Sequence, residues 1–148
     1  MKGFSFRLKS LHQVRIAEQQ NAENKVSEAN GQIQFLKNKL KILIEKREVA
    51  TQNYYVLLSK EDVFKEISLQ TNYINSLIEQ EKQLNQQITI LNNLCELKRQ
   101  ELITAANKVK ILDKLRENCL TDYLNEVSRS EQLFVDELAM FAFIRRSK

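Results

Sequence analysis

The feature that most constrains this chain is an unbroken heptad register over its C-terminal half. Steps of alternately three and four residues pass through nineteen positions, here called the seam, of which fourteen are apolar. A 3.5-residue repeat keeps one narrow apolar stripe facing a partner helix, and it winds the pair into a left-handed coiled coil. The register therefore predicts one long helix that needs a partner. The seam positions are Val63, Ile67, Gln70, Ile74, Leu77, Glu81, Leu84, Ile88, Leu91, Cys95, Lys98, Leu102, Ala105, Val109, Leu112, Arg116, Cys119, Tyr123 and Glu126.

The N-terminal half carries a seam of its own, which only Arg47 interrupts. Upstream of it, Leu8, Leu11, Arg15, Glu18 and Ala22 keep a different phase, so a stutter is predicted between Ala22 and Val26. The two halves of the chain thus supply two apolar stripes, each of which can bury the other. The N-terminal seam consists of Val26, Ala29, Ile33, Leu36, Leu40, Leu43, Arg47, Ala50, Tyr54 and Leu57.

The two registers are out of phase, and the slip falls at Ser59-Lys60-Glu61-Asp62. This run has the pattern of a capping box, in which Ser59 caps the amide of Asp62 at the start of a new helix. The prediction is an all-α fold with a single coiled-coil domain over residues 1–148, folded as a long antiparallel two-helix hairpin. Helix 1 is expected at about residues 4–57, the turn at about 58–62 and helix 2 at about 60–144. One continuous helix in a parallel dimer is the alternative, because neither Gly nor Pro forces the turn.

Composition supports long helices and argues against a compact globule. The chain has no Pro, no Trp and only two Gly, and 28% of its residues are charged. Of the 23 basic residues, seven lie in residues 1–15 and 145–148, so the remaining 16 are outnumbered by 19 acidic residues. Duplex binding needs a sustained basic stripe, which the body lacks. We therefore expect anionic protein or lipid surfaces as partners and no nucleic acid.

The residues needed for catalysis or metal binding are missing. His12 is the single histidine, Cys95 and Cys119 are too far apart for zinc-ligand spacing, and no glycine-rich loop is present. We predict no catalytic residue, cofactor, metal or small-molecule substrate, and no enzyme. Both cysteines fit small buried seam residues in a reducing compartment. The chain also shows neither a signal peptide nor a membrane-spanning stretch, so a cytoplasmic protein is expected.

The C-terminal end carries an apolar segment that the hairpin is too short to bury. Folding about residue 60 pairs position i with 120 − i, so residues beyond about 117 overhang helix 1. Ten of the twelve residues 133–144 are apolar, and Phe134, Leu138 and Phe141 share one helical face beside Arg145 and Arg146. The segment either folds back on the hairpin ends near Phe4 and Phe6 or serves as a docking surface.

Both ends of the chain resemble the FliJ family, a component of the bacterial flagellar type III export apparatus. The N-terminal match is Phe4-Ser5-Phe6-Arg7-Leu8 with Leu11, Arg15 and Glu18. The C-terminal match comprises Leu112, Leu115, Arg116, Glu117, Tyr123, Glu126, Arg129, Glu131, Asp136, Glu137 and Ala139. The length agrees as well, and the likeness covers essentially the whole chain.

The resemblance implies an antiparallel coiled coil similar to the stalk of rotary ATPases. Family members sit in the pore of a hexameric export ATPase, link it to the membrane export gate and escort substrate chaperones. The matching residues implied to face the ATPase are Phe4, Phe6, Arg7, Arg15, Asp136, Glu137 and Arg145. The gate is implied to contact Tyr54, Tyr55 and Tyr73 near the turn, with Tyr54 less available because it is a seam residue. The implied location is the inner face of the membrane at the flagellar base.

Three other functions compete with a flagellar export stalk. A stalk of a virulence-type type III secretion system has the same expected fold and mechanics. A self-assembling coiled-coil scaffold predicts concentration-dependent oligomers without an ATPase partner. A nucleic-acid clamp is the weakest alternative, and it predicts binding that falls steeply with salt.

Overall fold

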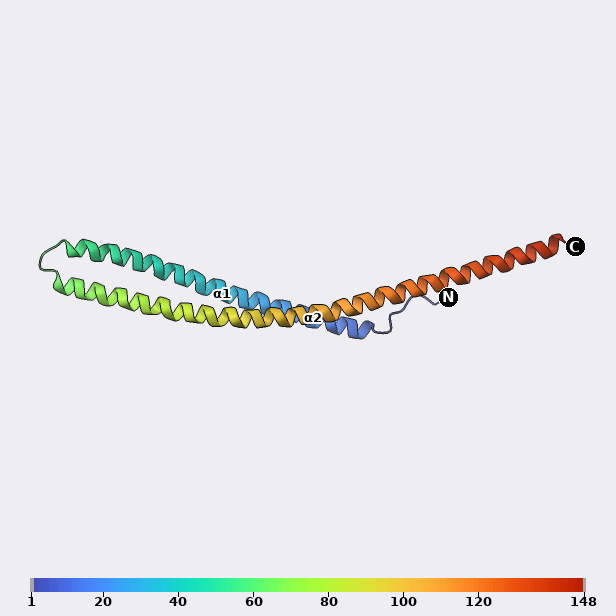
Figure 1. The fold of residues 1–148 in the computed structure, drawn as a ribbon, viewed down its shortest axis with the longest axis horizontal. Helices are drawn as coiled ribbons and strands as arrows, with labels where there is room; N and C mark the ends of the chain where they lie inside the picture. Colours follow the sequence, from blue (N-terminus) through green and yellow to red (C-terminus); the bar gives the residue numbers. More distant parts are fainter. Residues whose placement is uncertain (1, 148) are drawn as a thin grey trace. The chain divides into compact units, whose positions relative to one another are not determined.

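The computed structural model describes residues 2–147 and contains two long α-helices (Figure 1). Helix α1 spans Lys9–Leu58 and helix α2 spans Phe64–Arg146, with the turn at residues 59–63. From the turn the helices run back along each other in opposite directions. This confirms the predicted all-α antiparallel hairpin. The alternative of one continuous helix is wrong, because the chain reverses direction between the two registers.

The chain forms two compact units. One unit comprises residues 21–102, and the other comprises the residues up to Gln20 together with those from Ile103 onwards. Within each unit, residues of α1 pack against an antiparallel segment of α2. In the unit that contains the N-terminal residues, those that precede α1 also pack on α2. The assignment of the whole chain to a single domain stays a prediction.

The seam accounts for nearly all the burial in the hairpin. Every predicted seam position from Val26 to Leu57 and from Val63 to Leu112 is buried or half-buried. The tightest part is a cluster of Ala29, Ile33 and Cys95, against which Leu91 packs. Small side chains let the two backbones approach closely there. Both registers are therefore confirmed over these ranges, although a two-helix seam buries little area per residue.

Beyond Leu112 the predicted seam is wrong at Arg116, Cys119 and Glu126, which are exposed. Residues 113–122 are all exposed, including Arg116 and Cys119, and Tyr123 is half-buried. Cys95 is a buried seam residue as expected, whereas Cys119 is an exposed free cysteine. The reason is that α1 begins only at Lys9, five residues later than predicted, so no helical partner continues along this part of α2.

Two of the charged residues that interrupt the seam, Arg47 and Glu81, pair with each other. Arg47 Nε donates to Glu81 Oε1 at 2.7 Å, and the carboxylate side chain is only 14% exposed. A turn nearer the hairpin end, Gln70 donates to the carbonyl of Ala50 at 2.9 Å. A slip of the register would separate the ion pair and leave a carboxylate in the seam without a partner. The polar positions therefore specify how the helices align.

The alignment differs from the prediction by several residues. Arg47 pairs with Glu81 and not with residue 73, although Gln70 reaches Ala50 as the prediction placed it. The predicted stutter is also wrong. His12 and Gln19 occupy the half-buried positions where Leu11 and Glu18 were expected, so one heptad register runs from Leu8 to Leu57.

The turn forms without the predicted capping box. The Ser59 hydroxyl donates backwards to the carbonyl of Val56 at 2.7 Å, and α2 begins only at Phe64, so Ser59 closes α1 instead of capping α2. Asp62 adopts a left-handed conformation with φ of 55°. Aspartate tolerates this region better than most residues, which lets the chain reverse without glycine.

Residues 2–6, here called the N-terminal strap, are not helical although helix 1 was predicted to begin at about residue 4. An extended chain places alternate side chains on one side, which a helix cannot do for residues two apart. The Phe4 ring packs 5.7 Å from the Tyr123 ring, and the Tyr123 hydroxyl donates to the carbonyl of Lys2 at 3.0 Å. Phe6 is buried and meets the His12 ring edge-on. These contacts outweigh helix propensity at the chain start.

Candidate partner-binding surfaces

The last part of α2 is uncovered on all sides. Every residue from 128 to 147 is exposed, and Phe134, Leu138 and Phe141 are 61%, 53% and 66% exposed. These three residues form the C-terminal stripe. The predicted fold-back onto Phe4 and Phe6 is wrong, because those rings pack beside Tyr123 and His12. The overhang starts about ten residues later than expected, since the strap extends the covered length of α2.

The C-terminal stripe continues the face of α2 that the strap covers. Tyr123 contacts the strap, and Val127, one turn later, is half-buried. At about 100° per residue, both lie within roughly 20° of Phe134 around the helix axis. One side of α2 therefore changes from covered to bare within two turns.

A neighbouring side of this helical end, about 100° around the helix from Phe134, is also apolar but is interrupted by acid. Leu133, Met140 and Ile144 are 58%, 66% and 48% exposed, and Glu137 lies on the same side between them. Asp136 accepts a hydrogen bond from Gln132 at 3.0 Å. Glu137 also borders the stripe, because it lies three residues after Phe134 and four residues before Phe141. The two sides differ in that the stripe carries Arg145, whereas no basic residue lies among Leu133, Met140 and Ile144.

The two C-terminal arginines predicted to contact the ATPase, Arg145 and Arg146, are exposed. Arg145 follows Phe141 by one turn on the stripe side, and Arg146 is exposed next to it. Among the described residues, neither guanidinium forms an ion pair. An apolar stripe that ends in two unpaired cations suits a partner with an apolar surface edged by acid.

The residues predicted at the N-terminus are less available. Phe6 is buried, Phe4 is half-buried against Tyr123, and Arg15 donates to Glu18 at 3.0 Å. Arg7 is exposed at the turn that precedes α1. The structure therefore packs Phe4 on Tyr123 of α2 and Phe6 against His12 of α1, and a partner would reach them only by displacing the strap.

The three tyrosines near the turn do not form one surface. Tyr54 is half-buried and packs edge-on against Tyr55, whose side chain is 66% exposed. Tyr73 lines a shallow groove with Ile42 and Val49. On α1, position 55 lies about 120° or more from these groove residues. Tyr55 and Tyr73 therefore face different sides of the hairpin.

Sequence reasoning missed two exposed apolar residues beside the turn. Phe64 is 84% exposed and Leu69 is 69% exposed, both outside the seam at the start of α2. Their signal was available in the sequence, since both are large apolar residues at positions that the heptad register assigns to solvent.

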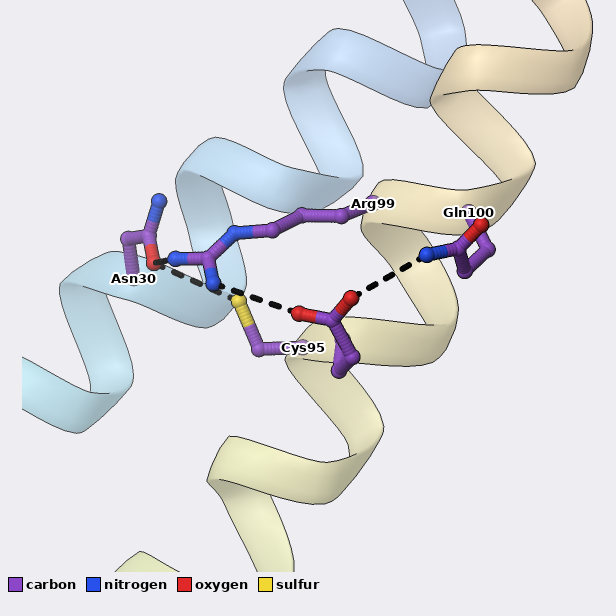
Figure 2. Close-up of polar contacts among 5 residues, drawn as sticks. Asn30, Cys95, Arg99 and Gln100 are labelled. Atoms are coloured by element: carbon purple, nitrogen blue, oxygen red, sulfur yellow. Dashed lines mark hydrogen bonds and ion pairs between the residues drawn. The ribbon is translucent and has the colours of Figure 1, made fainter.

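A polar cluster beside the seam is built around Asn30 (Figure 2). The buried Cys95 thiol donates to Asn30 Oδ1 at 3.3 Å, and Arg99 Nη2 donates to the same oxygen at 3.3 Å. Glu96 adds to the cluster, because it forms an ion pair with Arg99 and accepts a hydrogen bond from Gln100. The cysteine sulfur is enclosed between two helices and satisfied by one acceptor, so this arrangement aligns the helices and offers no room for a substrate.

Over residues 2–147, no group of three or more His, Cys, Asp or Glu side chains is placed to hold a metal ion. Within the same residues, neither helix has a stretch long and apolar enough to cross a membrane.

Two long helices, a thin seam and a bare apolar helix end define a coiled-coil hairpin protein that offers surfaces to partners. The family model described as "Flagellar FliJ protein" matches residues 4–148. The chain therefore belongs to the FliJ family and is related to flagellar protein export, in which the family is a non-catalytic component. Neither the comparison with curated proteins nor that with solved structures found a match.

Proposed function

We propose that this protein is a non-enzymatic central stalk and coupling component of the bacterial flagellar export apparatus. The C-terminal end of α2 binds inside the hexameric export ATPase ring, and the turn end of the hairpin contacts the membrane export gate. The protein also escorts substrate chaperones. It works in the cytoplasm, at the inner face of the cell membrane at the flagellar base. Membership of the FliJ family supports this proposal over a virulence-type system.

The observation that carries the ATPase contact is the bare C-terminal stripe. Three large apolar side chains left in water forgo roughly 1.5–3 kcal/mol each relative to full burial. A ring pore with an apolar lining would bury the stripe, and acidic residues at its mouth would attract Arg145 and Arg146. The described part of the chain supplies no other cover for these residues.

The gate contact is proposed for the side of the hairpin that carries Tyr73. Its groove already combines an aromatic ring with Ile42 and Val49, which are 52% and 57% exposed. Tyr55 belongs to a different side, and Tyr54 supports it from the seam. A partner with one flat surface can therefore contact Tyr73 or Tyr55 but not both. We propose Tyr73, because it lines an apolar groove.

The ATPase contact is tested by hydrolysis assays with the cognate export ATPase. We expect one wild-type chain per ring to stimulate hydrolysis or to stabilise the hexamer. The combined changes Phe134→Ser, Leu138→Ser and Phe141→Ser should abolish this effect and cell motility. A matched control carries Leu133→Ser, Met140→Ser and Ile144→Ser on the neighbouring side, about 100° around the helix, and it should retain most of the stimulation.

The basic end provides a second, weaker test of the same contact. Changing Arg145 and Arg146 to Gln should slow association and reduce its dependence on salt, while the stimulation at saturation persists. Normal stimulation by the stripe variant would show that another surface binds the ring.

A further inference from the structure

We infer that two copies of this chain pair through the C-terminal stripe in antiparallel orientation, with Glu131 of each copy beside Arg145 of the other. This pairing goes beyond the contacts with the export apparatus and does not depend on them. It starts from the same bare face of α2. The occupant is a second copy because the spacing and the charges of this face complement themselves.

The spacing along the face is palindromic. Steps of 4, 3, 4, 3 and 4 connect its six positions, so the face reads the same in both directions. When two such faces meet head to tail, Phe134 of one copy lies opposite Leu138 of the other at the centre. The contact is then isologous, as expected for a two-fold dimer. The six positions are Val127, Glu131, Phe134, Leu138, Phe141 and Arg145.

The charges on the face decide the orientation. Glu131 and Arg145 lie at opposite ends of the stripe, and neither forms an ion pair within residues 2–147. In an antiparallel pair Arg145 stands opposite Val127, one turn from Glu131, so two equivalent ion pairs form. A parallel pair in register would set Glu131 beside Glu131 and Arg145 beside Arg145, which is unfavourable.

The neighbouring side of the helix end, about 100° around the helix axis from the stripe, does not offer the same fit. Its corresponding positions include Glu126 and Glu137 and no basic residue. Pairing through that side would bury Glu137 against Leu133 without a cation to balance it. Although both sides are apolar and exposed, the charges thus favour the C-terminal stripe.

The area available is sufficient for a weak dimer. A phenylalanine buries roughly 150–250 Å² when fully covered, and a pair of stripes brings together four of them. Because Phe134 and Phe141 are 61% and 66% exposed in the single chain, these rings with two leucines and the stems of Arg145 bury less than the roughly 1,200 Å² at the lower end of specific interfaces, so the dimer is expected to be weak. Such a dimer should have a dissociation constant in the micromolar range. At that affinity the export ATPase ring could compete with the second copy for the stripe.

Pairing would have a regulatory consequence, and only this consequence depends on the proposed ATPase contact. A paired chain hides the stripe that is proposed to enter the ring. The chain that is not bound to the ring would thus exist as a dimer with its stripe buried. The ring would bind the monomer after the dimer dissociates.

Sedimentation equilibrium of the full chain, without lipid or partner, tests the pairing. We expect a monomer–dimer equilibrium that the triple Phe134→Ser, Leu138→Ser, Phe141→Ser variant weakens by more than about 100-fold. The triple Leu133→Ser, Met140→Ser, Ile144→Ser control should stay within about twofold of wild type. A monomeric wild-type chain at about 100 µM would overturn the inference, as would equal loss of pairing in the control.

Charge exchange tests the antiparallel orientation. Glu131→Arg alone and Arg145→Glu alone should each raise the dissociation constant roughly three- to tenfold, since two surface ion pairs are lost. The double variant should return to within about threefold of wild type, because the pairs re-form in reverse. Failure of the double variant to recover would exclude the antiparallel arrangement.

The outcomes separate this inference from the proposed function. If the wild-type chain stays monomeric while the stripe variant fails to stimulate the ATPase, only the pairing is wrong. If the chain pairs as described while the stripe variant stimulates normally, only the ring contact is wrong.

Discussion

Two stretches of the same helix, residues 64–112 and 128–146 of α2, are both rich in large apolar residues. The first buries one stripe of them, whereas the second leaves all of them exposed. Leu77 in the first stretch is 3% exposed, whereas Leu138 in the second is 53% exposed. The first stretch concentrates its burial on one heptad stripe and has α1 opposite to it. The second carries apolar residues on two sides and has no antiparallel partner within residues 2–147. Apolar content alone therefore does not decide burial, because a stripe is buried only where a partner segment reaches it.

The largest effect is expected from a charge placed in the seam. Leu77→Asp should lower the free energy of unfolding by about 3–5 kcal/mol, because a carboxylate would be buried without a partner. The neighbouring change Ile78→Asp, at a residue that is 47% exposed, should cost less than about 1 kcal/mol. Urea unfolding followed by circular dichroism at 222 nm measures both. Similar losses in the two variants would refute the register.

The same substitution in the two stretches provides the sharpest test of the comparison. Leu77→Ala should cost about 2 kcal/mol or more, since it removes packed methyl groups and leaves a cavity. Leu138→Ala should change hairpin stability by no more than about 0.5 kcal/mol, as expected for an exposed site. The protein concentration must be kept below the range of self-pairing. A large loss for Leu138→Ala under those conditions would mean that the helix end is buried in the free monomer.

A smaller effect is expected from the ion pair between Arg47 and Glu81. Arg47→Leu leaves a largely buried carboxylate, but Arg47 keeps 36% of its side chain in water, so we expect a loss of about 1 kcal/mol. Adding Glu81→Leu should restore the stability to wild type or above. A double-mutant cycle with urea unfolding gives the coupling energy. Strictly additive effects would show that the pair does not contribute to alignment.

Much of the hairpin could be predicted because heptad periodicity is a local property. Seam positions such as Leu77 and Cys95 were placed correctly, since the period alone assigns them to one face. The turn was placed within a few residues by the phase slip. The capping box failed because Ser59 has a nearer acceptor in the carbonyl of Val56. Competition of this kind between local hydrogen bonds does not show in a sequence pattern.

The candidate surfaces could be predicted in part. The apolar run at Phe134 and Phe141 marked the C-terminal end as exposed, because a partner helix of limited length cannot cover it. The strap was not foreseen, since the packing of Phe4 on Tyr123 joins residues more than a hundred positions apart. The separation of Tyr55 from Tyr73 also required the structure, because it depends on how two helices face each other.

The sequence by itself determined that this protein forms two helices, and where their stripes lie from Val26 to Leu57 and from Val63 to Leu112. These properties follow from periodicity and residue chemistry, which are encoded within a few turns of helix. Only the tertiary structure decided that Arg47 meets Glu81, that the strap covers Tyr123, and that the bare face begins near residue 128. Those outcomes depend on the alignment of two distant segments, and alignment is set by the summed packing of both helices.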